Sequence, residues 1–584
     1  MAVLLIGEGP AVESAEAMLE DSEVAVRRGG LGDIPGADLA IVVGLAGSAG
    51  FETANDRANE SETPWIAVEL GGIGGVPVAE LSAAVTTFQP GYVCFDCLHS
   101  RVAANDLGAA EEATAERPAA RLAGSYAGLQ AIRAFTGAEV AGVVIEVPYG
   151  EHSLLPVPNC PNAPERDRTL ELDENDRPLE EAIEAAERAV DGRLGIVPAI
   201  GEHESFPLPY YLATVTETGG FSDAAAPDRA AGVAPSWDEA FMKALGEALE
   251  RYSAAIYRTG ALDRVDPSAI DGPALDTYVS IGGSSEGTAA AGDTADRTRS
   301  GDGEPMDSIP LARGIDLHTE DPVELPADLV FYPPPEGRLG TSITTGLGLG
   351  SGGVEAVLSG LYEVLERDAT MIGWYSTFEP LGLDVTDSTF QSIVDRARGE
   401  GLSVTPLLVT QDVDVPVVAV AVHREDYPRF ALGSAADLDA EAAAVDALSE
   451  AIQNWVELRD LGPEEAGAAG GEIGSYAEDP GVAESMLETS ESVTAAAVGP
   501  DTVPEGRGEL DAVLDRMADA GLSAAAAPLT PRDVERLGFT AVRVLSPGAQ
   551  PLFVEEPVFG ERARTVPETL GFESRLDREF HPYP

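Results

Sequence analysis

The sequence predicts an α/β protein of two domains, with a layer of parallel strands and helices at its start. Short apolar runs at residues 2–7, 38–45 and 64–70 alternate with helix-like segments, the pattern of a parallel sheet. The chain of 584 residues is too long for a single domain with one hydrophobic core, since a domain has about 150 residues. Hydrophobic residues make up 44% of the chain, enough for a buried core despite the charge.

The first expected strand is followed by the turn Gly7-Glu8-Gly9-Pro10, where a dinucleotide-binding fold has its phosphate loop. The third glycine of that loop is missing. An ordinary tight turn between strand and helix is therefore the favoured interpretation.

The chain is strongly acidic: 101 acidic and 36 basic residues leave a net charge of -65, and Lys243 is its single lysine. This composition predicts a halophilic protein, because molar salt shortens the Debye length to about 3 Å and screens the self-repulsion. An acidic surface that binds a basic peptide is the alternative. Nucleic acid is not an expected partner, because such a surface repels phosphates.

Neither a membrane span nor an export signal is expected. No stretch approaches the roughly 20 apolar residues of a membrane helix, and the first residues lack a basic segment before their apolar run. A cytoplasmic protein without a membrane partner is expected.

Two helical segments repeat the pattern E-x-x-E-R. The residues are Glu247, Glu250 and Arg251 in the first segment, and Glu363, Glu366 and Arg367 in the second, where Glu355 lies two turns earlier. Residues three apart share one helix face, so each segment projects two carboxylates together. Carboxylates gathered this way suit Mg²⁺, and arginines suit phosphates. The alternative is an ordinary surface helix of an acidic protein.

The segments KALGEALERY and EAVLSGLYEVLERDA resemble the signature helices of the YcaO family. Other segments agree in order: LPADLVFYP, TQDVDVPVVAVAV, DALSEAIQ and VRVLSPGAQPL. The resemblance covers residues 187–584 and implies an α+β domain of mixed sheets and helices that binds ATP and Mg²⁺. It implies Mg²⁺ ligands at Glu247, Glu250, Glu355, Glu363 and Glu366, with Arg251, Arg367 and Lys243 in the ATP site.

Several positions depart from the family pattern. Lys243, Gly348 and Ser359 stand where family members commonly have Ser, Ser and Gln, and Ala443 stands where an arginine is expected before Glu450. These departures leave open a non-catalytic accessory protein that binds a peptide or partner.

The N-terminal segment, about residues 1–165, carries Cys94 and Cys97 as C-x-x-C, followed by Cys160. The stretch TTFQPGYVCFDCLHSR resembles the Rossmann-like E1/ThiF-like domain that accompanies YcaO domains in thiazole/oxazole-forming peptide maturases. In that family a second C-x-x-C completes a zinc site, and here Ala163 occupies the fourth position. A residual zinc site and a decayed site both stay open, with His152, His99 and Asp96 as candidate fourth ligands. The domain is expected to be a scaffold or to recruit the peptide.

The chain ends in Pro-Tyr-Pro, a short version of the proline-rich tail of peptide-cyclising family members. The carboxylate of Pro584 is therefore a candidate catalytic group. A flexible insertion is expected at about 284–308, where the sequence has no apolar periodicity.

The function implied by the resemblance is ATP- and Mg²⁺-dependent phosphorylation of a peptide backbone amide, a cyclodehydratase reaction that gives an azoline, or a thioamide. Modification of a ribosomal or other cellular protein is a further alternative. The expected partner is a peptide or protein substrate, and a homodimer stays open.

Overall fold

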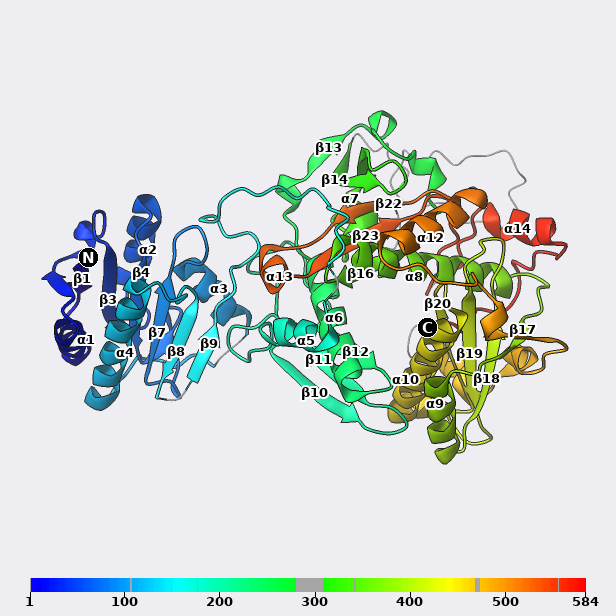
Figure 1. Ribbon diagram of the computed structural model, residues 1–584, viewed down its shortest axis with the longest axis horizontal. Helices are drawn as coiled ribbons and strands as arrows, with labels where there is room; N and C mark the ends of the chain where they lie inside the picture. Colours follow the sequence, from blue (N-terminus) through cyan, green and yellow to red (C-terminus); the bar gives the residue numbers. More distant parts are fainter. Residues whose placement is uncertain are drawn as a thin grey trace.

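The computed structural model describes residues 2–584 except 106–107, 149, 176, 280–307, 338, 340–342, 468–472 and 555. Residues 284–307 of the expected insertion lie outside the described residues. The N-terminal sheet and its helices lie at one end of the molecule, and the longer C-terminal part occupies the rest (Figure 1).

The N-terminal sheet has seven strands in the order β2-β1-β3-β4-β7-β8-β9. The strands β1 (Ala2–Ile6), β2 (Ala25–Arg28), β3 (Leu39–Leu45) and β4 (Trp65–Leu70) are parallel; β1, β3 and β4 were predicted, and β2 was not. The strands β7 (Ala83–Phe88), β8 (Val143–Val147) and β9 (Gly150–Ser153) pair antiparallel. Only the short hairpin β5 (Gly72–Ile73) and β6 (Val76–Pro77) joins β4 to β7, and it provides no crossover helix for parallel pairing.

Helices cover both faces of this sheet. Helices α1 (Pro10–Asp21) and α4 (Arg117–Phe135) share one apolar cluster with it. Helices α2 (Gly50–Ser61) and α3 (Phe95–Ala104) share a cluster on the other face. The α/β arrangement predicted for the start of the chain is confirmed.

The C-terminal part contains three further sheets. A three-stranded sheet is formed by β10 (Ala199–Glu204), β11 (Tyr210–Thr214) and β12 (Arg229–Val233). A six-stranded sheet is formed by β13 (Asp263–Val265), β14 (Ile309–Asp316), β22 (Ala525–Pro528), β23 (Thr540–Leu545) and β16 (Leu347–Gly350), with β15 (Pro322–Pro326) beside β14. A five-stranded sheet is formed by β20 (Phe430–Ala436), β19 (Val417–His423), β18 (Ser403–Leu408), β17 (Leu381–Asp384) and β21 (Ser492–Thr494).

The helices of this part are α5 (Leu179–Glu187), α6 (Trp237–Ala254), α7 (Ala327–Val330), α8 (Gly353–Trp374), α9 (Ser388–Gly399), α10 (Ala440–Ala466), α11 (Ile473–Glu478), α12 (Arg507–Asp519), α13 (Arg532–Leu537) and α14 (Arg562–Leu570). The expected mixture of sheets and helices is confirmed. Within the described part of the chain, no helix is long and apolar enough to cross a membrane.

Three helices lie unusually close to a strand: α6 on β12, α8 on β16 and α10 on β20. Each strand has a glycine at the contact. A Cβ would come within 2.3 Å of backbone atoms of α6 at Gly232, 2.1 Å of α8 at Gly348 and 2.3 Å of α10 at Gly433. Gly348, a departure from the family pattern, therefore has a packing reason, because a serine there would push the helix off the strand.

Candidate functional site

The three closely packed helices each place a glutamate against the neighbouring strand. Each carboxylate accepts a hydrogen bond from a backbone N–H in that strand or just before it. The pairs are Glu247 with Ala231 at 2.5 Å, Glu363 with Gly346 at 2.9 Å, and Glu450 with Ser434 at 2.6 Å. One oxygen of each carboxylate is thereby fixed in position.

Two more glutamates, Glu250 and Glu366, complete the cluster of five carboxylates. Burial, together with the charges of Glu363 and Glu247, raises the pKa of Glu250 to about 8. Burial also raises the pKa of Glu366 to about 8, and Glu450 adds to the effect although Arg367 opposes it. Glu366 is 7% exposed and accepts a hydrogen bond from Ser434 Oγ at 2.6 Å. These carboxylates lack sufficient positive charge, which a divalent cation would supply.

Arg367 connects this cluster to the end of the chain. Its Nη1 lies 3.3 Å from Glu366 Oε1 and donates to the Pro584 oxygen at 3.1 Å, while its Nη2 lies 4.0 Å from Glu450. Although burial disfavours the charged form, the carboxylates of Glu366 and Glu450 raise the pKa of Arg367 above its usual range. The C-terminus accordingly lies between α8 and α10 in Figure 1.

The other predicted site residues lie further out. Arg251 pairs with Glu247 at 2.5 Å and donates to the Arg229 carbonyl at 2.7 Å. Lys243 is exposed and lies 3.6 Å from Asp446 of α10. Glu355 is exposed at the start of α8, where it accepts from Ser351 N–H at 2.7 Å, about 12 Å along the helix from Glu363.

Two charged residues of the cluster were not predicted as site residues. Glu450 lies in the DALSEAIQ segment, and its signal was the family resemblance of that segment. Arg543 lies in β23, and its charge acts on both Glu250 and Glu363. No local pattern marks an isolated arginine in a buried strand as part of a site.

The donor set fits Mg²⁺ and a polyphosphate. Carboxylate oxygens are the hard ligands that Mg²⁺ takes in small numbers together with waters and phosphates. Among the described residues, no three of these carboxylates bring oxygens within 4.8 Å of one another. Each ion would therefore take one or two of them, and the arginines would neutralise phosphate oxygens.

The C-terminal tail is held at four successive points. Trp374 Nε1 donates to the Glu579 carbonyl at 2.8 Å, and Tyr476 Oη donates to the Phe580 carbonyl at 2.5 Å. His581 Nε2 contacts the Phe553 carbonyl at 2.7 Å, and Arg367 holds Pro584. These contacts hold Pro584 beside the cluster.

His581 is expected to make this docking sensitive to acid. It is 2% exposed, and burial lowers its pKa to about 4. The unfolded chain binds this proton near pH 6.5, so stability is full above pH 6.5 and falls by about 3 kcal/mol as the pH drops to 4. Melting temperatures over this range should fall less for His581→Gln than for the parent. The exposed His318→Gln serves as control; a pH profile identical in all three proteins would contradict the assignment.

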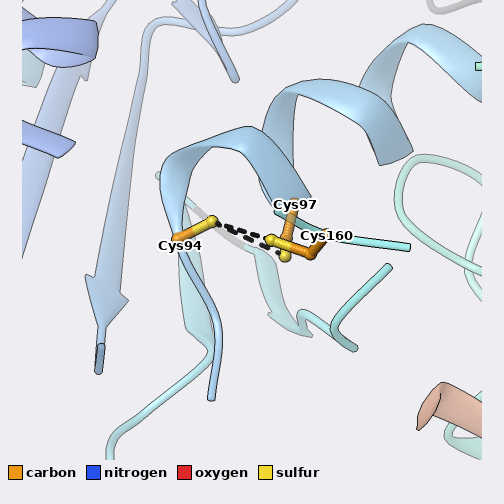
Figure 2. A group of neighbouring side chains, drawn as sticks. All are labelled: Cys94, Cys97 and Cys160. Atoms are coloured by element: carbon orange, nitrogen blue, oxygen red, sulfur yellow. Dashed lines mark hydrogen bonds between the residues drawn. The ribbon is translucent and has the colours of Figure 1, made fainter. Parts of the chain in front are cut away.

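The three cysteines form a second cluster, where α3 begins (Figure 2). Cys94 Sγ lies 3.8 Å from Cys97 Sγ and 3.4 Å from Cys160 Sγ, and all three are buried. Hydrogen bonds from Cys160 and Cys97 lower the pKa of the Cys94 thiol, while the pKa values of the other two are raised. Sulfurs bound to one tetrahedral Zn²⁺ are about 3.8 Å apart, so the three thiols fit such an ion.

Of the candidate fourth ligands, Asp96 lies nearest, with Oδ2 4.0 Å from Cys94 Sγ. His99 contacts the Gly74 carbonyl at 2.8 Å, and His152 contacts Asp191 at 2.5 Å. Both histidines are thus held by other groups.

The model of the family described as YcaO cyclodehydratase, ATP- and Mg²⁺-binding, matches residues 231–550. A heterocyclase solved in complex with substrate and cofactor has a TM-score of 0.74 at 19% identity, over 100% of this chain and 85% of that chain. The heterocyclase TruD has a TM-score of 0.63 at 19% identity, over 98% of this chain and 82% of that chain.

An uncharacterized protein of Methanothermobacter thermautotrophicus is 28% identical over 280 residues, 43% of this chain and 67% of that protein. The structural likenesses show a shared fold along the whole chain, while the family model covers more than half of it, including α6, α8 and α10. The chain therefore belongs to the YcaO family of ATP- and Mg²⁺-binding enzymes.

Proposed function

We propose that residues 187–584 phosphorylate a backbone amide of a peptide with ATP, giving an azoline or a thioamide. The observation that carries this proposal is the convergence of five glutamates, Arg367 and the Pro584 carboxylate from three helices and the chain end. Two of the similar solved structures are of heterocyclases, which supports a peptide substrate.

In the proposed reaction, a Cys, Ser or Thr side chain, or sulfide, adds to the amide carbonyl carbon. The former carbonyl oxygen attacks the γ-phosphorus of ATP, ADP leaves, and loss of phosphate with that oxygen then forms the C=N bond of an azoline or the C=S bond of a thioamide. The five glutamates would hold Mg²⁺, which neutralises phosphate charge. Pro584 would accept the proton that the attacking group loses.

Thermal unfolding with ATP and MgCl₂ in molar KCl tests the proposal. A ligand that binds only the folded protein raises the melting temperature. At a free ligand concentration of 100 times Kd, the free energy of unfolding increases by about 2.7 kcal/mol. We propose that the protein works at high salt, because its net charge is -65. Stabilisation that appears with ATP and Mg²⁺ and disappears with EDTA is expected. No shift at saturating ligand would favour the non-catalytic accessory protein.

We propose that the N-terminal residues, about 1–165, recruit the peptide or serve as a scaffold, with the three cysteines as their metal site. The purified protein is expected to contain less than one zinc ion per chain, because the site has only three thiolates and Ala163 occupies the position of the fourth. Metal analysis of the purified protein, with Cys94→Ala as control, measures this. A full equivalent of zinc that Cys94→Ala abolishes would contradict the expected partial occupancy.

ATP turnover is expected to depend on the position of the terminal carboxylate. Adding two glycines after Pro584 moves the carboxylate by up to about 7 Å from Arg367. ATP turnover should then fall at least about tenfold, while stabilisation by ATP and Mg²⁺ persists. The same two glycines at the N-terminus serve as control. Turnover equal to that of the parent would remove Pro584 from the mechanism.

A further inference from the structure

Arg543 is a buried cation in β23, next to the edge strand β16 of the six-stranded sheet. It lies opposite Leu347 of β16 and Ala527 of β22, and it is 4% exposed. Its neighbours on the same face of β23, Ala541 and Leu545, pack in one cluster with the end of α6. The Arg543 side chain therefore lies on the face of the sheet that packs against the end of α6.

The guanidinium of Arg543 has unused hydrogen-bond donors. Its Nε and Nη1 are shielded from solvent and have no acceptor among the described residues. The nearest carboxylates that affect it are those of Glu363 and Glu250, yet neither forms an ion pair with it within 4.0 Å in the described part of the chain. A buried N–H without a partner is unfavourable, so an acceptor supplied by a ligand would stabilise this arrangement.

The other two arginines of the site are already engaged. Arg367 holds Glu366 and Pro584, and Arg251 holds Glu247 and a backbone carbonyl. Arg543 alone among these three combines deep burial with free donors. Phosphate oxygens match a guanidinium fork in geometry and charge.

We propose that Arg543 binds the phosphate chain of ATP between the carboxylates of α6 and α8. The inference rests on the proposed function and adds a residue that the E-x-x-E-R pattern does not contain. Burial lowers the pKa of Arg543 to about 10, which still leaves it charged at neutral pH. The alternative is that Arg543 only balances the charges of Glu250 and Glu363 in the free protein.

Thermal unfolding and calorimetric binding of ATP with MgCl₂ distinguish the two roles in Arg543→Met. If Arg543 binds phosphate, the melting temperature without ligand should stay unchanged or rise, because two unpaired buried donors are removed. The Kd for ATP should increase about 10- to 100-fold. If Arg543 only balances charge, the melting temperature without ligand should fall and the Kd should change less than twofold, which would overturn the proposal.

Two more proteins complete the experiment. Arg543→Lys keeps the charge but loses the fork, and it should fold and bind ATP about tenfold more weakly; parent affinity in this variant would also overturn the proposal. Arg313→Met removes an 89% exposed arginine from β14 of the same sheet and should behave as the parent. A parent that does not bind ATP would refute the proposed function itself.

Discussion

ATP turnover is expected to fall at least about 100-fold when Glu366 is replaced by Gln, while the fold survives. Glu366 is 7% exposed and adjoins Arg367, Ser434 and Glu450, so its carboxyl group faces the site and can ionise when a cation binds. Gln keeps the shape and can still accept the hydrogen bond from Ser434, but it removes the anionic ligand. The loss should therefore be electrostatic.

The same substitution should not destabilise the free protein. Since the pKa of Glu366 is raised to about 8, its carboxyl is mostly neutral at pH 7, and a neutral amide replaces a neutral acid. The pKa is higher in the folded than in the unfolded chain, so the stability it contributes is full below pH 4.5 and is lost as the pH rises through 8. Glu366→Gln should consequently become more stable than the parent as the pH rises from about 4.5 to 8, and stay so above pH 8.

ATP turnover and melting temperature are measured for Glu366→Gln and for Glu464→Gln, which alters an exposed acid of α10. The Glu464 variant should match the parent, since isolated surface changes are worth about 0.5 kcal/mol or less. Parent-like turnover in Glu366→Gln would exclude the carboxylate as a metal ligand.

Arg101→Met is expected to reduce stability by about 3–5 kcal/mol, the largest effect on folding we expect in this chain. Arg101 of α3 forms an ion pair with Asp533 of α13, and Tyr252 of α6 donates to the same carboxylate at 2.6 Å. All three side chains are fully buried. Removing the arginine leaves the charge of the buried Asp533 carboxylate uncompensated, and this accounts for most of the expected loss of stability.

This buried triad joins the N-terminal layers to the site. Tyr252 follows Arg251 directly, and the cysteines pack in one apolar cluster with Leu245, Leu249 and Tyr252 of α6. The melting temperature of Arg101→Met should therefore drop by about 2–4 °C in high salt, because 584 residues unfold with a large entropy. The exposed pair Arg313–Asp263 provides the control, because Arg313→Met should change stability by less than about 1 kcal/mol.

A triple variant separates charge from packing. Replacing Arg101 by Met, Asp533 by Leu and Tyr252 by Phe removes every polar group of the triad. Most of the lost stability should return, since a buried ionic group can often be replaced by apolar side chains of similar size. An Arg101→Met protein as stable as the parent would show that the ion pair is not a stabilising link.

The sequence alone determined the features that depend on local spacing. The alternating apolar runs placed the parallel strands β1, β3 and β4, and the E-x-x-E-R spacing placed Glu363 and Glu366 on one helix beside Arg367. Such predictions work because a period of 2 or 3.6 residues is set by the backbone of a single element. The C-x-x-C spacing likewise brought Cys94 and Cys97 together.

The tertiary structure decided which residues distant in sequence meet. It added Glu450 and Arg543 to the cluster, set Pro584 against Arg367, and left Glu355 exposed at the start of α8. Each of these outcomes depends on how helices pack on strands, and close contacts such as that of Gly348 with α8 set that packing. The free energy of packing and of burying charge depends on many distant residues at once, which no local pattern encodes.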